Sequence, residues 1–513
     1  MNQPTTFPHS FFQKTSLLFF LILQCSIASF AQKALIKGTF ENVKNESFRI
    51  VLATQYYSQE EKNSIYNVKL DQNGNFYQEI KLSNPQIIHL QYYDKNSKTR
   101  LLHHLFLTPG DNLNINIDTS LNPKNIKVSG KHKENNQFLD ISKYIDLQKF
   151  KGDTLPDKVY NELERITHNN KLQLENYITK YKPTKEFIKS WQINLEYLAP
   201  QEYYTFEHNN KFSIRDSYAR NIDKWKNYRN KLFSKIKISN DEALISESYQ
   251  HLVRDILLRT KEELWKESSG ENKEQFYKEW YNSSIVEGNK LFIDDPENIL
   301  TEKIIQKYYT GKSAESAYAI LFKGSIEQEN NKNLPQIFEN FKKQFPNSKY
   351  IAQFEPKINK IIENNNKTLT EKMAFIEKGE ELKTFEEVIN QFKGKTVLID
   401  MWGTWCSPCK KEITQHSQAL HEYFKNKELQ FLYIANYDIH NPENWKKMIA
   451  YHSIEGNHIL ANDALTNDIM TKTKGKGYPT YIILKKDGSY ELSKAGYPMN
   501  RETLIKQLDD AIN

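Results

Sequence analysis

The stretch VLIDMWGTWCSPCKKEI, residues 397–413, joins an apolar run to two cysteines that are separated by Ser407 and Pro408. The apolar run predicts a buried strand, and the residues after the first cysteine predict the start of a helix. Cys406 would then lie at a helix N-terminus, where unpaired backbone N–H groups and the helix dipole stabilise a thiolate. The pattern therefore predicts Cys406 as a nucleophile, with Cys409 one turn further on and within reach to close a disulfide.

Three roles are open to two cysteines at this spacing: zinc ligands, a structural disulfide and a redox centre. Zinc sites commonly use four ligands, and no histidine pair at zinc-finger spacing follows the motif. Haem attachment requires a histidine directly after the second cysteine, where this chain has Lys410. A disulfide that closes so small a loop constrains the unfolded chain little. We therefore expect redox chemistry, with no metal and no dissociable organic cofactor.

The first 31 residues have the three-part layout of a secretory signal. Lys14 precedes the apolar run LLFFLIL at residues 17–23, and the small residues Ser29 and Ala31 follow. The apolar run is shorter than the roughly 20 residues that span a bilayer. We therefore expect cleavage after Ala31 and an exported protein.

The third cysteine, Cys25, lies inside this leader. Lipoprotein processing at Cys25 is the alternative to cleavage after Ala31, but it requires a small residue just before the cysteine, where this chain has Gln24. Ordinary cleavage leaves Cys406 and Cys409 as the only thiols of the exported chain.

Length, charge and patterning indicate several domains. A chain of 513 residues is too long for one core. Its 71 basic and 64 acidic residues form no long block of one sign, so nucleic acid is not an expected partner. Residues 32–130 hold short alternating segments such as NFYQEIKL, which predict a small antiparallel β-sandwich-like domain. Residues 131–368 carry apolar and aromatic residues at three- and four-residue spacing, for example over 241–265, and predict an all-α region with tryptophans in its core. Residues 369–513 alternate strands and helices, as α/β domains do.

Two segments, VLIDMWGTWCSPC and YPTYIILKKDG, together with this order of strands and helices, resemble the thioredoxin superfamily. The closer resemblance is to its exported TlpA-like branch, which acts in extracytoplasmic disulfide reduction and cytochrome c maturation. It covers residues 369–513 and implies a thioredoxin-like fold there. The β and helical regions resemble the N-terminal extensions of Bacteroidetes envelope proteins.

The resemblance implies a role for each residue around the cysteines. Cys406 would attack a partner disulfide, and Cys409 would resolve the mixed disulfide. Asp400 corresponds to a buried acid that takes the proton from Cys409, since a carboxyl group in apolar surroundings has a raised pKa. Glu412 corresponds to a glutamate that provides a second proton relay or touches the partner. A solvent-facing Asp400 and a solvated Glu412 are the alternatives.

On the substrate side, Pro479 corresponds to the cis-proline that faces the active-site disulfide. The backbone of Tyr478 would then pair with an extended partner segment, in the manner of strand addition. Trp402 and Trp405 would flank the site, with Trp405 beside the thiols. The family often has a proline at the position of Thr414, so we expect a straighter helix here. Four other residues form no ligand set and are expected at the surface: His103, His104, His416 and His421.

We therefore expect a thiol–disulfide oxidoreductase of the periplasm or cell envelope that reduces disulfides in envelope proteins. No histidine lies between the cysteines, and Asp400 disfavours further negative charge, so both features favour a reductant over a strong oxidant. Such a reductant would need recharging by a membrane thiol electron donor. One alternative is an envelope adaptor with an accessory thioredoxin domain. The other is a peroxide-reducing redoxin, although its cysteine usually lies in a T-x-x-C context.

Overall fold

The computed structural model describes residues 32–513 except 42, 53–63, 95–97, 99, 119, 121 and 142–144. The expected leader, with Cys25 and Ala31, lies outside these residues. The chain divides between Arg259 and Thr260 into two compact units, which are described separately. A helix with the length and apolar character needed to cross a membrane is absent from the described part of the chain.

The first unit begins with two four-stranded sheets, ordered β4-β1-β7-β8 and β3-β2-β5-β6. Their strands are β1 (Gln32–Phe40), β2 (Ser47–Val51), β3 (Ile65–Lys69), β4 (Asn75–Leu82), β5 (Gln86–Tyr93), β6 (Arg100–Leu107), β7 (Asn112–Ile117) and β8 (Lys127–Gly130). The expected β-region is confirmed. The expectation of purely antiparallel pairing is wrong at β1 and β7, which pair in parallel.

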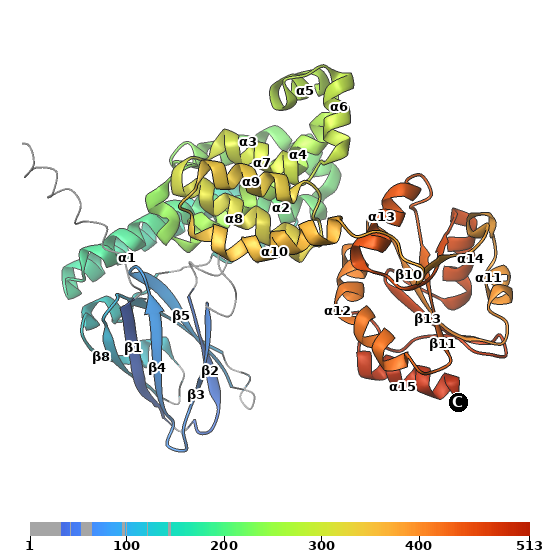
Figure 1. Ribbon diagram of the computed structural model, residues 1–513. Coiled ribbons are helices and arrows are strands. Elements are labelled where there is room, and N and C mark those ends of the chain that lie inside the picture. The colour runs from blue at the N-terminus through green and yellow to red at the C-terminus, as the bar shows by residue number, and fades with distance from the viewer. Residues whose placement is uncertain are drawn as a thin grey trace, which may run out of the picture. The chain divides into compact units, whose positions relative to one another are not determined.

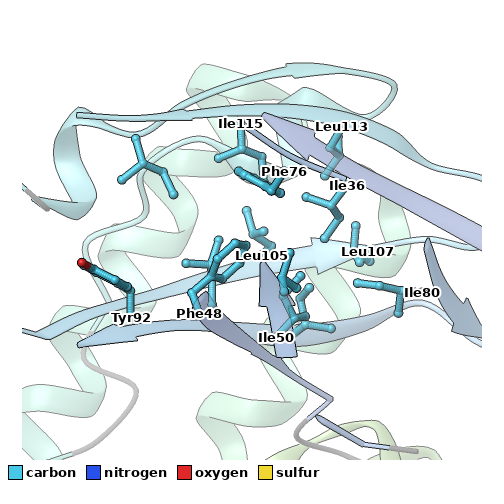
Figure 2. Packing of buried hydrophobic residues seen from close by; sticks show 14 of the residues in the cluster. Ile36, Phe48, Ile50, Phe76, Ile80, Tyr92, Leu105, Leu107, Leu113 and Ile115 are labelled. Atoms are coloured by element: carbon cyan, nitrogen blue, oxygen red, sulfur yellow. The ribbon is translucent and has the colours of Figure 1, made fainter. Parts of the chain in front are cut away.

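The core of this β-region lies between the two sheets. Buried and exposed residues alternate along β2 and β7, as the two-residue period of a strand requires. Figure 2 shows Ile36 and Ile115 of one sheet packed over Phe48 and Ile50 of the other. The aromatic rings of Phe40 and Phe48 lie 5.0 Å apart between centroids. The alternation of apolar and polar residues in the sequence therefore corresponds to one buried face on each sheet.

Four helices follow in the order α1 (Asp157–Tyr181), α2 (Lys185–Arg220), α3 (Ile222–Phe233) and α4 (Glu247–Ser269). Residues 241–265, which show helical spacing in the sequence, begin with a 3₁₀ turn at Asp241–Ile245 and continue in α4. The Ser246 hydroxyl accepts a hydrogen bond from the Tyr249 backbone N–H at 3.2 Å and so caps the first turn of α4.

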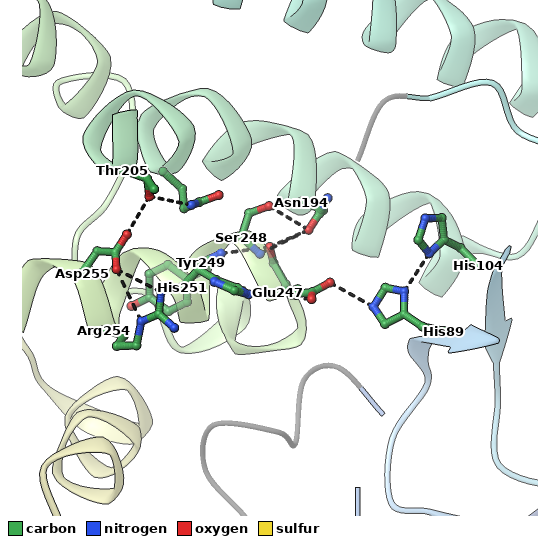
Figure 3. A network of polar contacts seen from close by, with 12 residues as sticks. His89, His104, Asn194, Thr205, Glu247, Ser248, Tyr249, His251, Arg254 and Asp255 are labelled. Atoms are coloured by element: carbon green, nitrogen blue, oxygen red, sulfur yellow. Dashed lines mark hydrogen bonds and ion pairs between the residues drawn. The ribbon is translucent and has the colours of Figure 1, made fainter. Parts of the chain in front are cut away.

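Polar contacts join the β-region to α4 (Figure 3). His89 on β5 faces His104 on β6 through their Nδ1 atoms at 2.8 Å, and its Nε2 lies 3.1 Å from a Glu247 carboxylate oxygen. The neighbouring His103 is buried, and this burial lowers its pKa to about 4. The expected surface position is therefore wrong for His103.

The second unit opens with the last part of α4, from Thr260 onward. It continues with helices α5 (Lys273–Tyr281), α6 (Ile285–Asp294), α7 (Asn298–Tyr308), α8 (Gly311–Glu327), α9 (Leu334–Gln344) and α10 (Lys349–Asn365). Aromatic residues fill the space between α8, α9 and α10. The Phe322 ring lies 5.3 Å from Phe338 and 5.5 Å from Phe354 between centroids. The all-α region is thus confirmed, and Trp280 is buried as expected.

A six-stranded sheet ordered β14-β13-β10-β11-β12-β9 completes the second unit. Its strands are β9 (Met373–Phe375), β10 (Thr396–Trp402), β11 (Leu429–Ala435), β12 (Gly456–Leu460), β13 (Thr480–Leu484) and β14 (Tyr490–Leu492). Its helices are α11 (Phe385–Gln391), α12 (Ser407–Phe424), α13 (Pro442–His452), α14 (Asp463–Thr473) and α15 (Arg501–Ile512). β10 pairs in parallel with β11 and antiparallel with β13, so the expected α/β fold class is confirmed.

Helices cover both faces of this sheet. Every residue of β10 is buried, and successive side chains point to opposite faces. Leu398 and Trp402 belong to the core under α12 and α15, whereas Ile399 and Met401 belong to the core under α11 and α14. Figure 1 shows these two pairs of helices on opposite sides of the sheet. β10 is therefore enclosed by helices and neighbouring strands. The cysteine segment follows the end of this fixed strand.

Candidate active site

The cysteine pair lies where β10 passes into α12. Cys406 is the N-cap residue of α12, and its Sγ accepts a hydrogen bond from the Cys409 backbone N–H at 3.2 Å. The two sulfurs form a disulfide. Cys406 is 3% exposed and Cys409 is 0% exposed. When the disulfide is reduced, the same N–H group and the positive end of the helix dipole stabilise a thiolate on Cys406.

A short loop before the cysteines is fixed by residues that follow β11. The Thr404 backbone N–H and hydroxyl donate hydrogen bonds to the Asp438 carboxylate at 2.8 and 2.6 Å. The Trp405 indole N–H donates to the Asn436 carbonyl at 2.9 Å. A Cβ atom at Gly403 would lie 2.4 Å from the Trp405 indole nitrogen. The observed position of the Trp405 ring therefore requires glycine at residue 403. The loop is therefore braced against the end of the neighbouring strand.

Three aromatic side chains lie together beside the cysteines. The Trp405 ring lies 5.9 Å from Tyr437 and 5.6 Å from Tyr478 between centroids. Trp405 is 51% exposed and Tyr437 is 53% exposed. We call Trp405, Tyr437 and Tyr478 the aromatic patch. Trp402, by contrast, is fully buried and belongs to the core that contains both cysteines.

Tyr478 and Pro479 lie just before β13, and the peptide bond between them is cis. Neither the N–H nor the carbonyl group of Tyr478 makes a hydrogen bond within the described residues. This short backbone segment is thus open to pairing with another extended chain.

Two carboxyl groups, Asp400 on β10 and Glu412 on α12, line one small cavity in the core; we call them the carboxyl pair. Asp400 is buried, and its Oδ1 has no hydrogen-bond partner among the described residues. Burial raises the pKa of Asp400 to about 8, and the nearby Glu412 carboxylate adds to this rise. Glu412 is also buried, and its Oε2 accepts a hydrogen bond from the Met499 backbone N–H at 2.9 Å. The alternatives of a solvent-facing Asp400 and a solvated Glu412 are therefore wrong.

Two histidines of α12 also depart from the expected surface position. His416 lines the small cavity that holds the carboxyl pair, and its Nε2 lies 3.7 Å from the Glu412 Oε2. His421 stacks on Phe431 at 3.8 Å between ring centroids, and burial lowers its pKa. Helix α12 runs unbroken through Thr414.

A loop of the helical region in the second unit reaches the cysteine segment. The Ser407 hydroxyl donates a hydrogen bond to the Gln328 carbonyl, and the Lys410 ammonium group donates to the Glu329 carbonyl at 3.0 Å. Both carbonyls lie in the connection between α8 and α9. One flank of the cysteine pair is therefore covered by backbone from elsewhere in the chain.

Sequence reasoning missed Tyr437 and Asp438, although a signal for them was present. Both follow β11, and the carboxyl ends of neighbouring parallel strands meet at one edge of a sheet. Residues after β11 therefore had to lie near the end of β10. The described part of the chain contains no group of three or more histidine, cysteine, aspartate or glutamate residues placed to hold a metal ion.

Comparison with known proteins places this site in a class. Residues 394–490 match the family model of thioredoxin-like domains. The thiol-disulfide oxidoreductase ResA of Bacillus thuringiensis subsp. konkukian is 39% identical over 44 residues, which are 9% of this chain and 25% of that protein. A ResA protein of Bacillus cereus is 26% identical over 113 residues, which are 20% of this chain and 54% of that protein. The chain thus spans between a quarter and about half of the length of these curated relatives.

Among solved structures, the thioredoxin domain of a thiol-disulfide oxidoreductase from Bacteroides vulgatus is 26% identical, with a TM-score of 0.21, over 24% of this chain and 84% of that one. A thiol:disulfide interchange protein from Chlorobium tepidum is 22% identical, also with a TM-score of 0.21, over 24% and 84% of the respective chains. The C-terminal region of this protein is a thioredoxin-like domain. It is similar to the thiol–disulfide oxidoreductases of the ResA type.

Proposed function

We propose that this protein is an exported thiol–disulfide oxidoreductase that reduces disulfides in proteins of the cell envelope. The observation that carries the proposal is the Cys406–Cys409 disulfide at the N-terminus of α12, with the buried carboxyl of Asp400 on β10, the strand that leads into it. A helix N-terminus favours the attacking thiolate, and a buried acid of raised pKa accepts a proton near neutral pH.

The reaction has two exchange steps. The Cys406 thiolate attacks one sulfur of the partner disulfide, which breaks the partner's S–S bond, forms a mixed disulfide and releases the partner's other sulfur as a thiolate. Asp400, in its carboxylate form, which a pKa of about 8 leaves to a minority of molecules at pH 7, then takes the proton from Cys409. The Cys409 thiolate attacks the Cys406 sulfur and expels the partner's remaining sulfur. Two electrons pass from the dithiol to the partner, and the protein is left with the disulfide seen here.

The partner approaches through an extended segment. The unpaired backbone of Tyr478 offers one donor and one acceptor for strand addition, and the aromatic patch supplies an apolar contact beside it. A substrate cysteine held in this way lies next to Cys406. Specificity then comes from main-chain pairing with few side-chain requirements.

The direction of electron flow is proposed as reductive. A strong oxidant stabilises its reduced form through an unusually acidic thiol. Here the buried carboxyl pair lies on β10 and α12, the two elements on either side of the cysteine segment, and opposes further negative charge. A reductant in an oxidising compartment needs a membrane thiol donor to regenerate its dithiol. A reduction potential near −270 mV, roughly that of thioredoxin, would support this direction, and a value near −120 mV would oppose it.

The activity is tested with insulin as a disulfide substrate and dithiothreitol as the electron source. The full chain is expected to accelerate insulin reduction, and the double variant C406S/C409S is expected to give only the rate of dithiothreitol alone. Hydrogen peroxide serves as the competing substrate in a parallel assay. Equal insulin reduction by the two proteins would contradict the proposal, and peroxide turnover as fast as insulin turnover would favour a redoxin.

Substitution of Trp405 tests the docking surface. Trp405→Ala is expected to raise the KM for insulin about fivefold to tenfold, because loss of one aromatic contact at an interface costs about 1 kcal/mol. Turnover of a small aromatic disulfide, which does not need the patch, is expected to change little. Tyr423→Ala, at a comparably exposed aromatic position on α12, is the matched control. An unchanged KM in Trp405→Ala would exclude the aromatic patch as a docking surface.

A further inference from the structure

The proton that the buried Asp400 accepts needs a route to solvent. In the proposed reaction, on which this inference rests, each cycle delivers one proton from Cys409 to Asp400. Asp400 is buried in the core between β11 and β13, so it cannot pass this proton to bulk water directly. Without an exit, Asp400 stays protonated and cannot accept the next proton.

The cavity beside Asp400 leads toward α12. It has a volume of about 20 Å³, which suffices for about one water molecule. Five titratable residues line it: Asp400, Glu412, His416, Tyr433 and Tyr481. Burial raises the pKa of both phenols far above the neutral range, so Tyr433 and Tyr481 keep their protons. The groups left to exchange protons are the carboxyl pair and His416.

Within this set, His416 lies closest to solvent. It stands one helical turn after Glu412 on α12, and its Nε2 is 3.7 Å from the Glu412 Oε2. The His416 side chain is 19% exposed, whereas that of Glu412 is 4% exposed. The His416 Nδ1 is itself buried and makes no hydrogen bond within the described residues, so no contact holds the ring in one orientation, and a proton reaches solvent when the ring turns.

We propose that His416 carries protons between the carboxyl pair and solvent. The proton of Asp400 passes across the cavity to Glu412, then to Nε2 of His416, and the imidazolium releases it to bulk water. Each transfer breaks one bond to hydrogen and forms another, and Asp400 returns to its carboxylate form. The same route runs inward when a reductant opens the disulfide and Cys409 leaves as a thiolate that needs a proton. His416 acts through Glu412 and does not touch the sulfurs in this scheme.

The test uses the full chain with the variant His416→Gln. The rate measured is the opening of the Cys406–Cys409 disulfide by dithiothreitol at pH 7, in a dilute buffer that cannot itself carry protons into the site. The expected result is a rate about tenfold lower than that of the wild type, which is less than the roughly 100- to 10,000-fold effect of a group that transfers a proton directly to a reacting atom, because His416 acts through Glu412. Added imidazole is expected to restore most of the rate, which no purely structural role predicts. Alkylation of reduced Cys406 by iodoacetamide is expected to stay unchanged.

His421→Gln is the matched control. His421 lies on the same helix, but its Nε2 faces the Tyr433 hydroxyl at 3.3 Å, and it does not line the cavity. It is expected to keep the wild-type rate with and without imidazole.

His416→Asn provides a second, smaller side chain, and both His416 variants are judged by the fraction of the rate that imidazole restores. A wild-type rate in dilute buffer, or a slow rate that imidazole leaves unchanged, overturns the proposal. Because dithiothreitol opens the chain's own disulfide, this result is independent of whether insulin is a substrate.

Discussion

A Cys409→Ser variant is expected to accumulate as a covalent complex with its disulfide substrate. Cys406 still attacks and forms the mixed disulfide, but the second thiol that would resolve it is missing. Cys409 is the more deeply buried of the two cysteines and lies one turn inside α12, so the partner sulfur is joined to Cys406. Electrophoresis without reductant after mixing with insulin is expected to show most of the variant in the complex, and mass spectrometry locates the linkage.

The companion variant Cys406→Ser separates attack from resolution. It is expected to form no complex and to lose insulin reduction by at least about a thousandfold, as enzymes do when the nucleophile is removed. The wild type is expected to show only a trace of complex, because Cys409 resolves it. A complex on Cys406→Ser and none on Cys409→Ser would reverse the assignment of the two cysteines.

Asp400→Asn is expected to stabilise the oxidised protein strongly at pH 8 and hardly at all at pH 4. In the folded protein the pKa of Asp400 is raised to about 8 from an ordinary value of 3.8. The unfolded chain therefore loses this proton from about pH 4 upward, whereas the folded chain keeps it. The stability of the wild type consequently falls as the pH rises from about 4 to 8, by at most about 6 kcal/mol at 1.36 kcal/mol per unit. Asparagine does not ionise and removes this loss.

Hydrogen exchange of the β10 amides measures this effect locally, since the chain has two compact units and a single unfolding transition is not assured. The gain in β10 protection in Asp400→Asn is expected to grow with pH and to level off above pH 8. Asp463→Asn, at the exposed first residue of α14, is the control and is expected to change little. A gain of equal size at pH 4 and pH 8 would mean that the Asp400 carboxyl is not held neutral.

The centre of the site could be predicted because its determinants are local in the sequence. An apolar run before W-C-x-x-C fixes a buried strand, and the helix after it places Cys406 at a helix N-terminus. The burial of Asp400 was implied by the resemblance, with a solvent-facing side chain as the alternative, and the structure shows every position of β10 buried. The role of the carboxyl in proton transfer came only from resemblance and remains a prediction.

The parts that could not be predicted depend on contacts between distant segments. Periodicity places His416 on a helix but does not say which face of that helix covers the carboxyl pair. The parallel pairing of β1 with β7 joins strands that lie far apart in the chain, and alternation alone does not choose the partner. Asp438 could have been found from strand adjacency, but the contact of Ser407 with the Gln328 carbonyl had no local signal.

The contacts of Gln328 and Glu329 with Ser407 and Lys410 restrict how a disulfide can reach the sulfurs. The protein's own main chain covers one flank of the cysteine segment, so we expect a substrate disulfide to approach from the side of Tyr478. A disulfide that is buried in the surface of a folded protein cannot reach Cys406 in this way. A disulfide on a flexible segment or in an unfolded protein can. We therefore expect the connection between α8 and α9 to favour substrates whose disulfide lies on a flexible or unfolded segment.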